Sequence, residues 1–230
     1  MAGKRGIHLL LLTVLALGVW HAAHAEEGDE SIAPEEAPPA PIAAVVEPPV
    51  ATVAPMPVGN LADGERGYAV CAVCHLENGA GRPDGVFPQL AGQHASVTYR
   101  QIADIRDGRR DNPIMAPFAM TLTDPQDLAD LAAYIESLPL PPDNGKGPGD
   151  DYALGATLYE RDCVDCHGER GQGNAERLVP VVAGQHYAYL ARQIDDIAGR
   201  HRRNSDPKMT GVVTTYTERE RRAVADYISR

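Results

Sequence analysis

The chain has 230 residues, of which 43% are hydrophobic and 23% are charged, and its formal net charge at pH 7 is -11. Such an acidic balance argues against nucleic acid or an anionic membrane surface as a partner. It suits docking to a basic surface on a partner protein.

Residues 1–25 have the composition of a secretory signal. Lys4 and Arg5 give a positive start, residues 7–20 form an apolar core too short to span a bilayer comfortably, and residues 23–25 form an A-x-A cleavage site. We predict that the mature chain begins near Glu26, outside the cytoplasm. Membrane association is expected only if the signal stays uncleaved.

Residues 26–58 form a low-complexity leader. They contain eight prolines, seven acidic residues and no basic or aromatic residue. Such a stretch cannot bury enough apolar surface to offset the entropy lost on ordering. We therefore expect a disordered, extended spacer or a solubilising tail.

Two short strings carry the strongest chemical signal: C-A-V-C-H at residues 71–75 and C-V-D-C-H at residues 163–167. Each is a C-x-x-C-H motif, the pattern of covalent c-type haem attachment. At a helix end the two cysteines lie on one side, where each thiol adds to a porphyrin vinyl group. We predict two covalently bound haem c groups and, because this haem is attached on the exported side of a bacterial membrane, a periplasmic location. The predicted attachment residues are Cys71, Cys74, Cys163 and Cys166, and the predicted iron ligands are His75 and His167.

Other uses of the four cysteines fit less well. A zinc site would have 88 residues between its two cysteine pairs, far more than a zinc ribbon has. A thioredoxin-like C-x-x-C motif would need a βαβ pattern, and none is visible.

An internal duplication relates the two motifs at a constant offset of 92 residues. The string A-G-Q-H at residues 91–94 recurs at residues 183–186, and R-Q-I at residues 100–102 recurs at residues 192–194. We predict two small domains, residues 59–137 and 151–230, joined by a Pro- and Gly-rich linker at residues 138–150.

Each repeat is predicted to contain three helices in an all-α fold, because no segment alternates like a strand. The first helices (residues 61–74 and 151–166) carry the motifs, and the second (residues 95–107 and 187–199) follow the A-G-Q-H strings. The third helices run to about residues 135 and 228. They are predicted to start at capping boxes, in which Thr123 pairs with Gln126 and Thr217 pairs with Glu220.

Each repeat is short and poor in large aromatic side chains, since the only two phenylalanines are Phe87 and Phe118. Domains of this size usually need a covalent cross-link or a bound metal for stability. We expect the porphyrin to complete the core and the apo-protein not to fold.

A six-coordinate iron needs a second ligand, for which methionine is the natural candidate. Met209 is the only methionine of the second repeat and lies eight residues before Thr217. Met115 lies eight residues before Thr123, and this matching register favours Met115 over the rival Met120. A thioether favours reduced iron, so His/Met ligation raises the reduction potential.

Other polar residues near the motifs have open interpretations. His94 and His186 follow a Gly-Gln turn, and we interpret them as turn or surface residues rather than iron ligands. Four arginines lie just before the methionines and either pair with haem propionates or are solvated; they are Arg109, Arg110, Arg202 and Arg203.

These motifs together resemble the cytochrome c4 family. The resemblance covers residues 59–230 and includes F-P-Q-L-A-G-Q, V-P-V-V-A-G-Q, two R-Q-I-x-D-I strings and two endings of the form A-x-Y-I. It implies two tandem class I cytochrome c domains whose haems face each other across a pseudo-twofold interface. It also implies that the carbonyls of Pro88 and Pro180 accept the Nδ1 proton of the proximal histidines. The long leader and Pro125, which looks like one inserted residue, depart from the family pattern.

The resemblance implies an electron-transfer protein that is not itself an enzyme. It would carry single electrons in the periplasm from respiratory-chain donors to a terminal oxidase or reductase, both of them redox partner proteins. The alternative is a haem-bearing, electron-accepting subunit of a periplasmic sulfide or alcohol dehydrogenase. An enzyme with an open iron site fits less well, because two methionines would fill both sixth positions.

Overall fold

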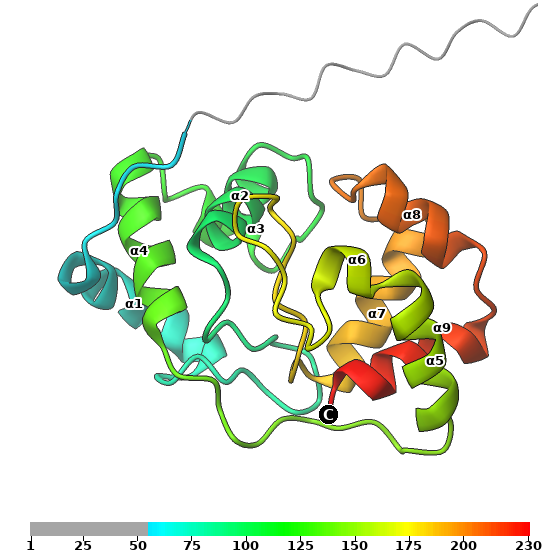
Figure 1. The fold of residues 1–230 in the computed structure, drawn as a ribbon. Helices are drawn as coiled ribbons and strands as arrows, with labels where there is room; N and C mark the ends of the chain where they lie inside the picture. Colours follow the sequence, from blue (N-terminus) through cyan, green and yellow to red (C-terminus); the bar gives the residue numbers. More distant parts are fainter. Residues whose placement is uncertain (1–54) are drawn as a thin grey trace, which may run out of the picture. The chain divides into compact units, whose positions relative to one another are not determined.

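The computed structural model describes residues 55–230, so the predicted signal and most of the predicted leader lie outside the described residues. The described residues are helical (Figure 1). They contain one isolated antiparallel bridge, between Asn174 and Val179, and no extended β-strand. The predicted all-α fold is confirmed. Between residues 55 and 230, no helix combines the length and apolar character needed to cross a membrane.

The end of the predicted leader packs against the first repeat. Met56 contacts the apolar cluster formed by the second and last helices of that repeat. The Val58 carbonyl accepts a hydrogen bond of 2.8 Å from the Gln126 side chain. The last residues of the predicted leader, 55–58, therefore contact the first repeat.

The first repeat contains α1 (Leu61–His75), α2 (Ala95–Arg106), the short α3 (Ala116–Ala119) and α4 (Pro125–Ser137). The predicted bounds of α1 and α2 are confirmed to within one residue. The segment that contains α3 was expected to be a loop, and the short helix places Met115 at its N-cap.

The start of α4 differs from the predicted capping box at Thr123. Asp124 is the N-cap, and its side chain accepts a hydrogen bond of 2.8 Å from the Gln126 backbone N–H. Pro125 occupies the first helical position, where its missing N–H costs nothing and its fixed φ suits the helix. The inserted proline thus moves the helix start by one residue.

The second repeat contains α5 (Tyr152–Asp162), α6 (Val164–His167), α7 (Tyr187–Ala198), α8 (Pro207–Thr214) and α9 (Glu218–Ile228). The helix predicted over residues 151–166 is interrupted at Cys163, where the Cys166 N–H bonds the Cys163 carbonyl in a tighter i to i+3 turn. The capping box of Thr217 and Glu220 at the start of α9 is confirmed.

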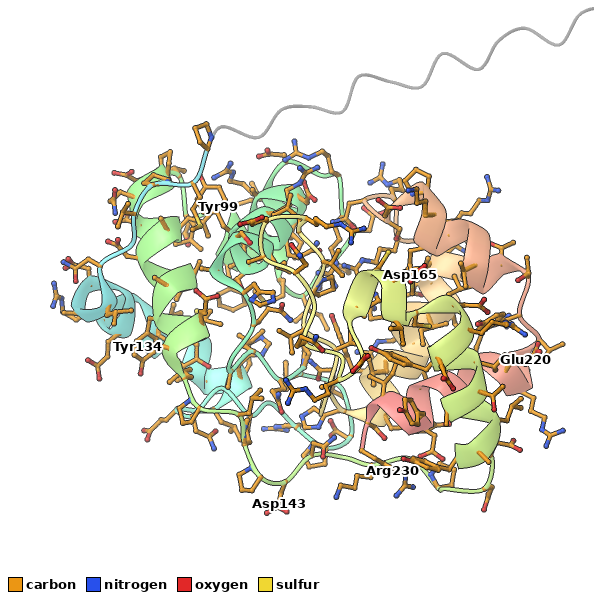
Figure 2. The ribbon with its side chains drawn as sticks, viewed as in Figure 1. Tyr99, Tyr134, Asp143, Asp165, Glu220 and Arg230 are labelled. Atoms are coloured by element: carbon orange, nitrogen blue, oxygen red, sulfur yellow. The ribbon has the colours of Figure 1, made fainter. Side chains whose placement is uncertain are left out.

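The first helix of each repeat packs against the last helix, α1 on α4 and α5 on α9 (Figure 1). Glycines at the crossings, Gly64 and Gly155, allow the close approach, because a β-carbon there would overlap the carbonyl oxygens of Asp130 and Ala223. An aromatic pair supports the first crossing, where the ring of Tyr134 on α4 (Figure 2) packs against that of Tyr68 at a tilt of 53°, with the ring centroids 5.4 Å apart.

Candidate functional site

The first motif occupies the last turn of α1. Cys71 and Cys74 are half-buried free thiols, and the His75 side chain lies almost fully inside the protein at 3% exposure. Residues three and four apart share one face of a helix, so both sulfurs and the imidazole face the same region. Tyr68, one turn before, donates a hydrogen bond of 2.9 Å to the Leu76 carbonyl and fixes the chain just after the histidine.

The second motif has the same arrangement on a different local backbone. Cys163 lies between α5 and α6, and the His167 N–H bonds the Cys163 carbonyl at 2.9 Å. Cys163 and Cys166 are half-buried free thiols. Tyr159 donates a hydrogen bond of 2.7 Å to the Gly168 carbonyl, as Tyr68 does to Leu76 in the first repeat.

Both motif histidines are oriented by a proline carbonyl. The Nδ1 atom of His75 lies 2.9 Å from the Pro88 oxygen, and the Nδ1 atom of His167 lies 3.1 Å from the Pro180 oxygen. A carbonyl oxygen can only accept, so Nδ1 carries the proton in each ring. These are the contacts that the family resemblance implied.

The donor set fits a haem iron on each side. Burial lowers the pKa of both histidines, which favours the neutral ring. With the proton on Nδ1, the Nε2 lone pair is free, and it has no hydrogen-bond partner among residues 55–230. Burial also raises the pKa of the Cys71 thiol to about 11 and that of Cys163 to about 12. Neutral imidazole nitrogens and unpaired thiols at this spacing are the groups that c-type haem uses.

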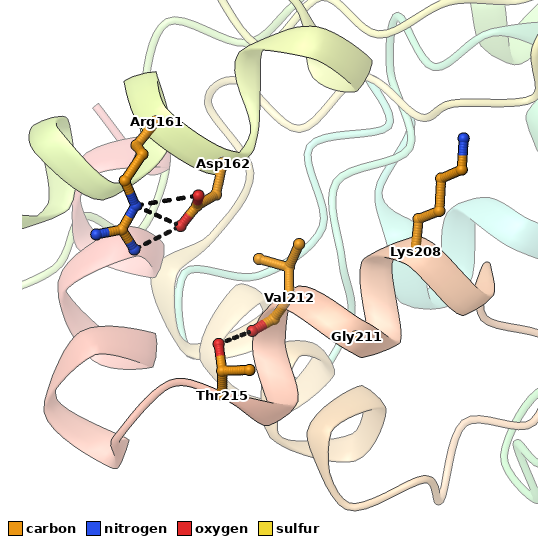
Figure 3. Close-up of a pocket in the computed structure, with 6 residues that line it drawn as sticks. All are labelled: Arg161, Asp162, Lys208, Gly211, Val212 and Thr215. Carbon is orange, nitrogen blue, oxygen red and sulfur yellow. Dashed lines mark hydrogen bonds and ion pairs between the residues drawn. The ribbon is translucent and has the colours of Figure 1, made fainter.

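A cavity of about 500 Å³ adjoins the second motif (Figure 3). It lies between the end of α5, where Asp162 precedes Cys163, and α8, which carries Met209. None of the predicted haem-binding residues Cys163, Cys166, His167 and Met209 lines it. Its lining residues are Arg161, Asp162, Lys208, Gly211, Val212 and Thr215.

The candidate methionines differ in their surroundings. Met209 on α8 is half-buried and packs against the apolar core of the second repeat. Met115 is half-buried at the N-cap of α3, where its N–H bonds the Asn112 side chain at 3.1 Å. Met120, at the other end of α3, is 65% exposed.

The A-G-Q-H strings form contacts between the repeats. His186 is 1% exposed, and its Nε2 atom lies 2.8 Å from the Ala80 oxygen in the loop after the first motif. His94 makes the reciprocal contact, with its Nε2 atom 2.9 Å from the Gln172 oxygen. His186 follows the predicted turn as the N-cap of α7, but the expectation of a surface position is wrong for it. Sequence reasoning missed this role because the contacts are long-range, although the recurrence of the string was a signal.

Comparisons with known proteins agree with this geometry. The sequence matches the Cytochrome c family over residues 61–139 and again over residues 152–230. Cytochrome c4 of Pseudomonas aeruginosa is 33% identical over 178 residues, which cover 74% of this chain and 88% of that protein. The thiosulfate dehydrogenase electron acceptor of Stutzerimonas stutzeri is 32% identical over 188 residues, which cover 73% of this chain and 86% of that protein. The crystal structure of reduced recombinant cytochrome c4 from Pseudomonas stutzeri matches with a TM-score of 0.67 and 29% identity, over 75% of this chain and 98% of that chain.

The chain belongs to the cytochrome c4 family. The resemblance found in the motifs is thereby confirmed, together with the fold of two tandem cytochrome c domains. A cytochrome c4 is a dihaem electron carrier, and this chain has two cytochrome c domains that bind covalent haem c.

The four arginines that precede the methionines make two kinds of contact. Arg109 pairs with Asp104 and Asp107 of its own repeat, and Arg203 pairs with Asp111 across the repeats at 2.9 Å. Arg110 and Arg202, which occupy equivalent positions, instead converge on shared glutamine side chains.

The shared glutamines are Gln101 and Gln193. Arg110 donates to both at 2.9 Å, and Arg202 donates to Gln193 at 3.0 Å and to Gln101 at 2.9 Å. Burial and the neighbouring guanidinium of Arg110 lower the pKa of Arg202 to about 10. Two like charges are thus held together at the contact between the repeats by neutral acceptors.

Proposed function

We propose that Cys71 and Cys74 attach one haem c and Cys163 and Cys166 attach the other. His75 and His167 then ligate the irons through Nε2. The free Nε2 lone pair on a ring held by a proline carbonyl is the observation that carries this proposal.

Met115 and Met209 are the proposed sixth ligands. Both are half-buried and precede the last helix of their repeat, whereas the exposed side chain of Met120 favours a surface position. Haem iron, when bound, supplies a one-electron Fe(III)/Fe(II) couple. The chain's own residues hold the two imidazoles in one orientation and one tautomer through the carbonyls of Pro88 and Pro180. They exclude water from His75 by burial, and the thioethers favour the reduced state.

The proposed setting is the periplasm, where this electron carrier takes single electrons from a respiratory-chain donor and passes them to a terminal oxidase or reductase. The carrier makes and breaks no substrate bond. Its net charge of -11 suits a partner with a basic docking surface, and screening by salt weakens such an encounter.

A second candidate is the electron-accepting subunit of a periplasmic dehydrogenase. The relative from Stutzerimonas stutzeri is named as a thiosulfate dehydrogenase electron acceptor. Part of a thiosulfate dehydrogenase from Marichromatium purpuratum also matches with a TM-score of 0.62, over 40% of that chain. These two findings favour thiosulfate dehydrogenase over the sulfide and alcohol enzymes as the donor.

The ligand assignment is tested by absorption spectroscopy of the purified holoprotein. We expect two haems per chain and the far-red sulfur-to-iron(III) band of His/Met ligation. Met115→Ala and Met209→Ala should each remove one haem's share of that band, and Met120→Ala should leave the band intact. Loss of the band in Met120→Ala with retention in Met115→Ala would reverse the assignment in the first repeat.

The choice of donor is tested by stopped-flow reduction of the oxidised holoprotein. A thiosulfate dehydrogenase with its substrate and a quinol-oxidising membrane complex are compared as donors at low and high salt. Fast, salt-sensitive reduction by the dehydrogenase alone would select the second candidate. Reduction by the membrane complex alone would select the first.

A further inference from the structure

The A-G-Q-H glutamines contact the peptide groups that hold the motif histidines. In the first repeat, the Pro88 carbonyl accepts from His75 Nδ1, and the N–H of Gln89 belongs to the same peptide group. That N–H donates a hydrogen bond of 2.9 Å to the side-chain oxygen of Gln185, in the other repeat. A planar peptide group therefore connects the imidazole of one repeat to the glutamine of the other.

The second repeat has the equivalent connection, with the roles of the two repeats exchanged. The Pro180 carbonyl accepts from His167 Nδ1, and the N–H of Val181 donates to the Gln93 side-chain oxygen at 2.9 Å. Each glutamine also donates from its side-chain nitrogen, Gln185 to the Gln89 carbonyl at 2.8 Å and Gln93 to the Val181 carbonyl at 2.9 Å.

The glutamine oxygens are fixed in place before they meet the other repeat. The Gln185 oxygen also accepts from the N–H of His186 at 3.0 Å, and the Gln93 oxygen accepts from the N–H of His94 at 3.2 Å. Each oxygen thus takes one hydrogen bond from its own turn and one from the opposite repeat. The acceptor is held rigidly at the end of the peptide group.

We propose that Gln185 tunes the reduction potential of the haem in the first repeat and that Gln93 tunes the haem in the second. This inference rests on the proposed ligation by His75 and His167. A peptide N–H that donates to a good acceptor makes its own carbonyl a better acceptor, because hydrogen bonds in a chain polarise one another. A better acceptor on Nδ1 makes the imidazole a more basic ligand, which favours Fe(III) and lowers the potential.

The two connections differ in burial. Gln89 and Gln185 are both buried, at 7% and 9% exposure, whereas the bonds of Gln93 are only partly buried. Hydrogen bonds are electrostatically stronger where water is excluded. The effect of Gln185 on the first haem should therefore exceed the effect of Gln93 on the second.

The test replaces each glutamine by methionine, which has a similar length and no amide. The two potentials of each holoprotein are measured by spectroelectrochemical titration. NMR assigns them through contacts between the haem methyl groups and the thioether bridges of Cys71 or Cys163. Gln185→Met should raise the potential of the first haem, and Gln93→Met that of the second. We expect a shift of about threefold to tenfold in the redox equilibrium constant, where tenfold corresponds to about 59 mV for a one-electron couple.

This crossed pattern separates tuning from simple packing. Looser packing between the repeats would shift both haems in both variants, and that result would overturn the proposal. Unchanged potentials in a protein with two haems would also overturn it, while leaving the proposed function intact. A purified chain without haem would instead contradict the proposed function.

A second readout follows the histidine protons directly. In the reduced, diamagnetic protein, the Nδ1–H resonance of His75 should move upfield in Gln185→Met, and that of His167 should stay in place. If Gln185→Met fails to fold, Gln185→Asn keeps the amide but is one methylene too short to reach Gln89, and it should give the same shift. An unmoved His75 resonance in a folded variant would overturn the proposal.

Discussion

The two repeats make the same hydrogen bonds to their motif histidines but surround them with different side chains. In the first repeat, apolar residues near the motif and the methionine are exposed, with Val73 at 75%. The equivalent positions of the second repeat are found by aligning Cys71 with Cys163 and Met115 with Met209. They hold mostly charged or polar residues, among them the exposed Asp165 on α6 (Figure 2). The apolar residues are Val70, Val73, Ile114, Phe118 and Met120, and their counterparts are Asp162, Asp165, Lys208, Val212 and Thr214.

This difference indicates which positions of a duplicated domain are constrained by the function of the motif. The orientation of the imidazole depends on a carbonyl at one position, and both repeats keep it. The outward-facing residues have no such requirement, and they have diverged. The interiors have diverged as well. The second repeat has one apolar cluster, against which Cys163 and Met209 pack, and the first has two clusters that are bridged by Ile102 and Leu122.

Removing one haem at a time should have the largest effect and should differ between the repeats. With its core in two clusters, neither of which includes Met115, the first repeat depends more on the porphyrin for apolar contacts. We expect the double variant Cys71→Ser/Cys74→Ser to lose the helical signal of the first repeat. The double variant Cys163→Ser/Cys166→Ser should keep part of the helical signal of the second repeat. Circular dichroism and limited proteolysis of the two single-haem proteins measure this, and equal losses would contradict the comparison of the cores.

The sequence predicted best what depends on local chemistry. The C-x-x-C-H motifs located the ends of α1 and α6, and the Thr217 capping box located the start of α9. The short helices that carry or follow the methionines were missed, although Asp206 and Pro207 are a recognisable N-cap and first-turn pair for α8. The roles of Gln93, Gln185 and His186 could not be predicted, because their partners lie 88 to 106 residues away in the chain or in the linker.

A glycine substitution at each helix crossing tests what the repeats share. Gly64→Ala and Gly155→Ala place a β-carbon against the backbone of α4 and α9, which must then move apart. We expect a loss of about 3 kcal/mol in the free energy of unfolding for each, as for other overpacked sites. Denaturant titration followed by haem absorbance measures it.

Gly67 provides the matched control on α1. Its β-carbon would meet nothing within 4 Å, so Gly67→Ala should stabilise the protein by up to about 1 kcal/mol through helix propensity alone. If Gly64→Ala were as stable as Gly67→Ala, the close approach of α1 to α4 would be wrong.

Replacement of the two histidines of the A-G-Q-H strings should lower the free energy of unfolding by different amounts. His186 is buried, donates from Nε2 to the Ala80 carbonyl and accepts the Gly145 N–H on Nδ1 at 3.0 Å. His186→Leu leaves both backbone groups without a partner, which should cost about 2 kcal/mol. His94→Leu should cost less, because His94 is more exposed and its second contact is with Glu136 at 3.4 Å.

The same comparison predicts a dependence on pH. Burial lowers the pKa of His186 below its ordinary value, while the Ala80 carbonyl and Asp84 act in the opposite direction. A group whose pKa is lowered by folding binds more protons in the unfolded state, so its contribution is complete above about pH 6.5 and is lost as the pH falls below that. Thermal unfolding of the holoprotein between pH 5 and 7 should therefore vary less in His186→Leu than in the parent. An unchanged pH slope would show that His186 is not the titrating group.

The smallest effect concerns the residue after each motif histidine. Leu76 has φ 66° and ψ 159°, and its counterpart Gly168 has φ 78° and ψ 163°. This region is adopted readily only by glycine and costs other residues about 1–3 kcal/mol. Leu76→Gly removes that strain but loses some packing of a side chain that is 40% exposed, and it gains freedom in the unfolded chain. We expect a net stabilisation of about 0.5 kcal/mol. Leu76→Ala is the control, because it loses the same packing and keeps the strain. Leu76→Gly should therefore be clearly more stable than Leu76→Ala in denaturant titration, and the reverse order would mean that the first repeat holds this turn without strain.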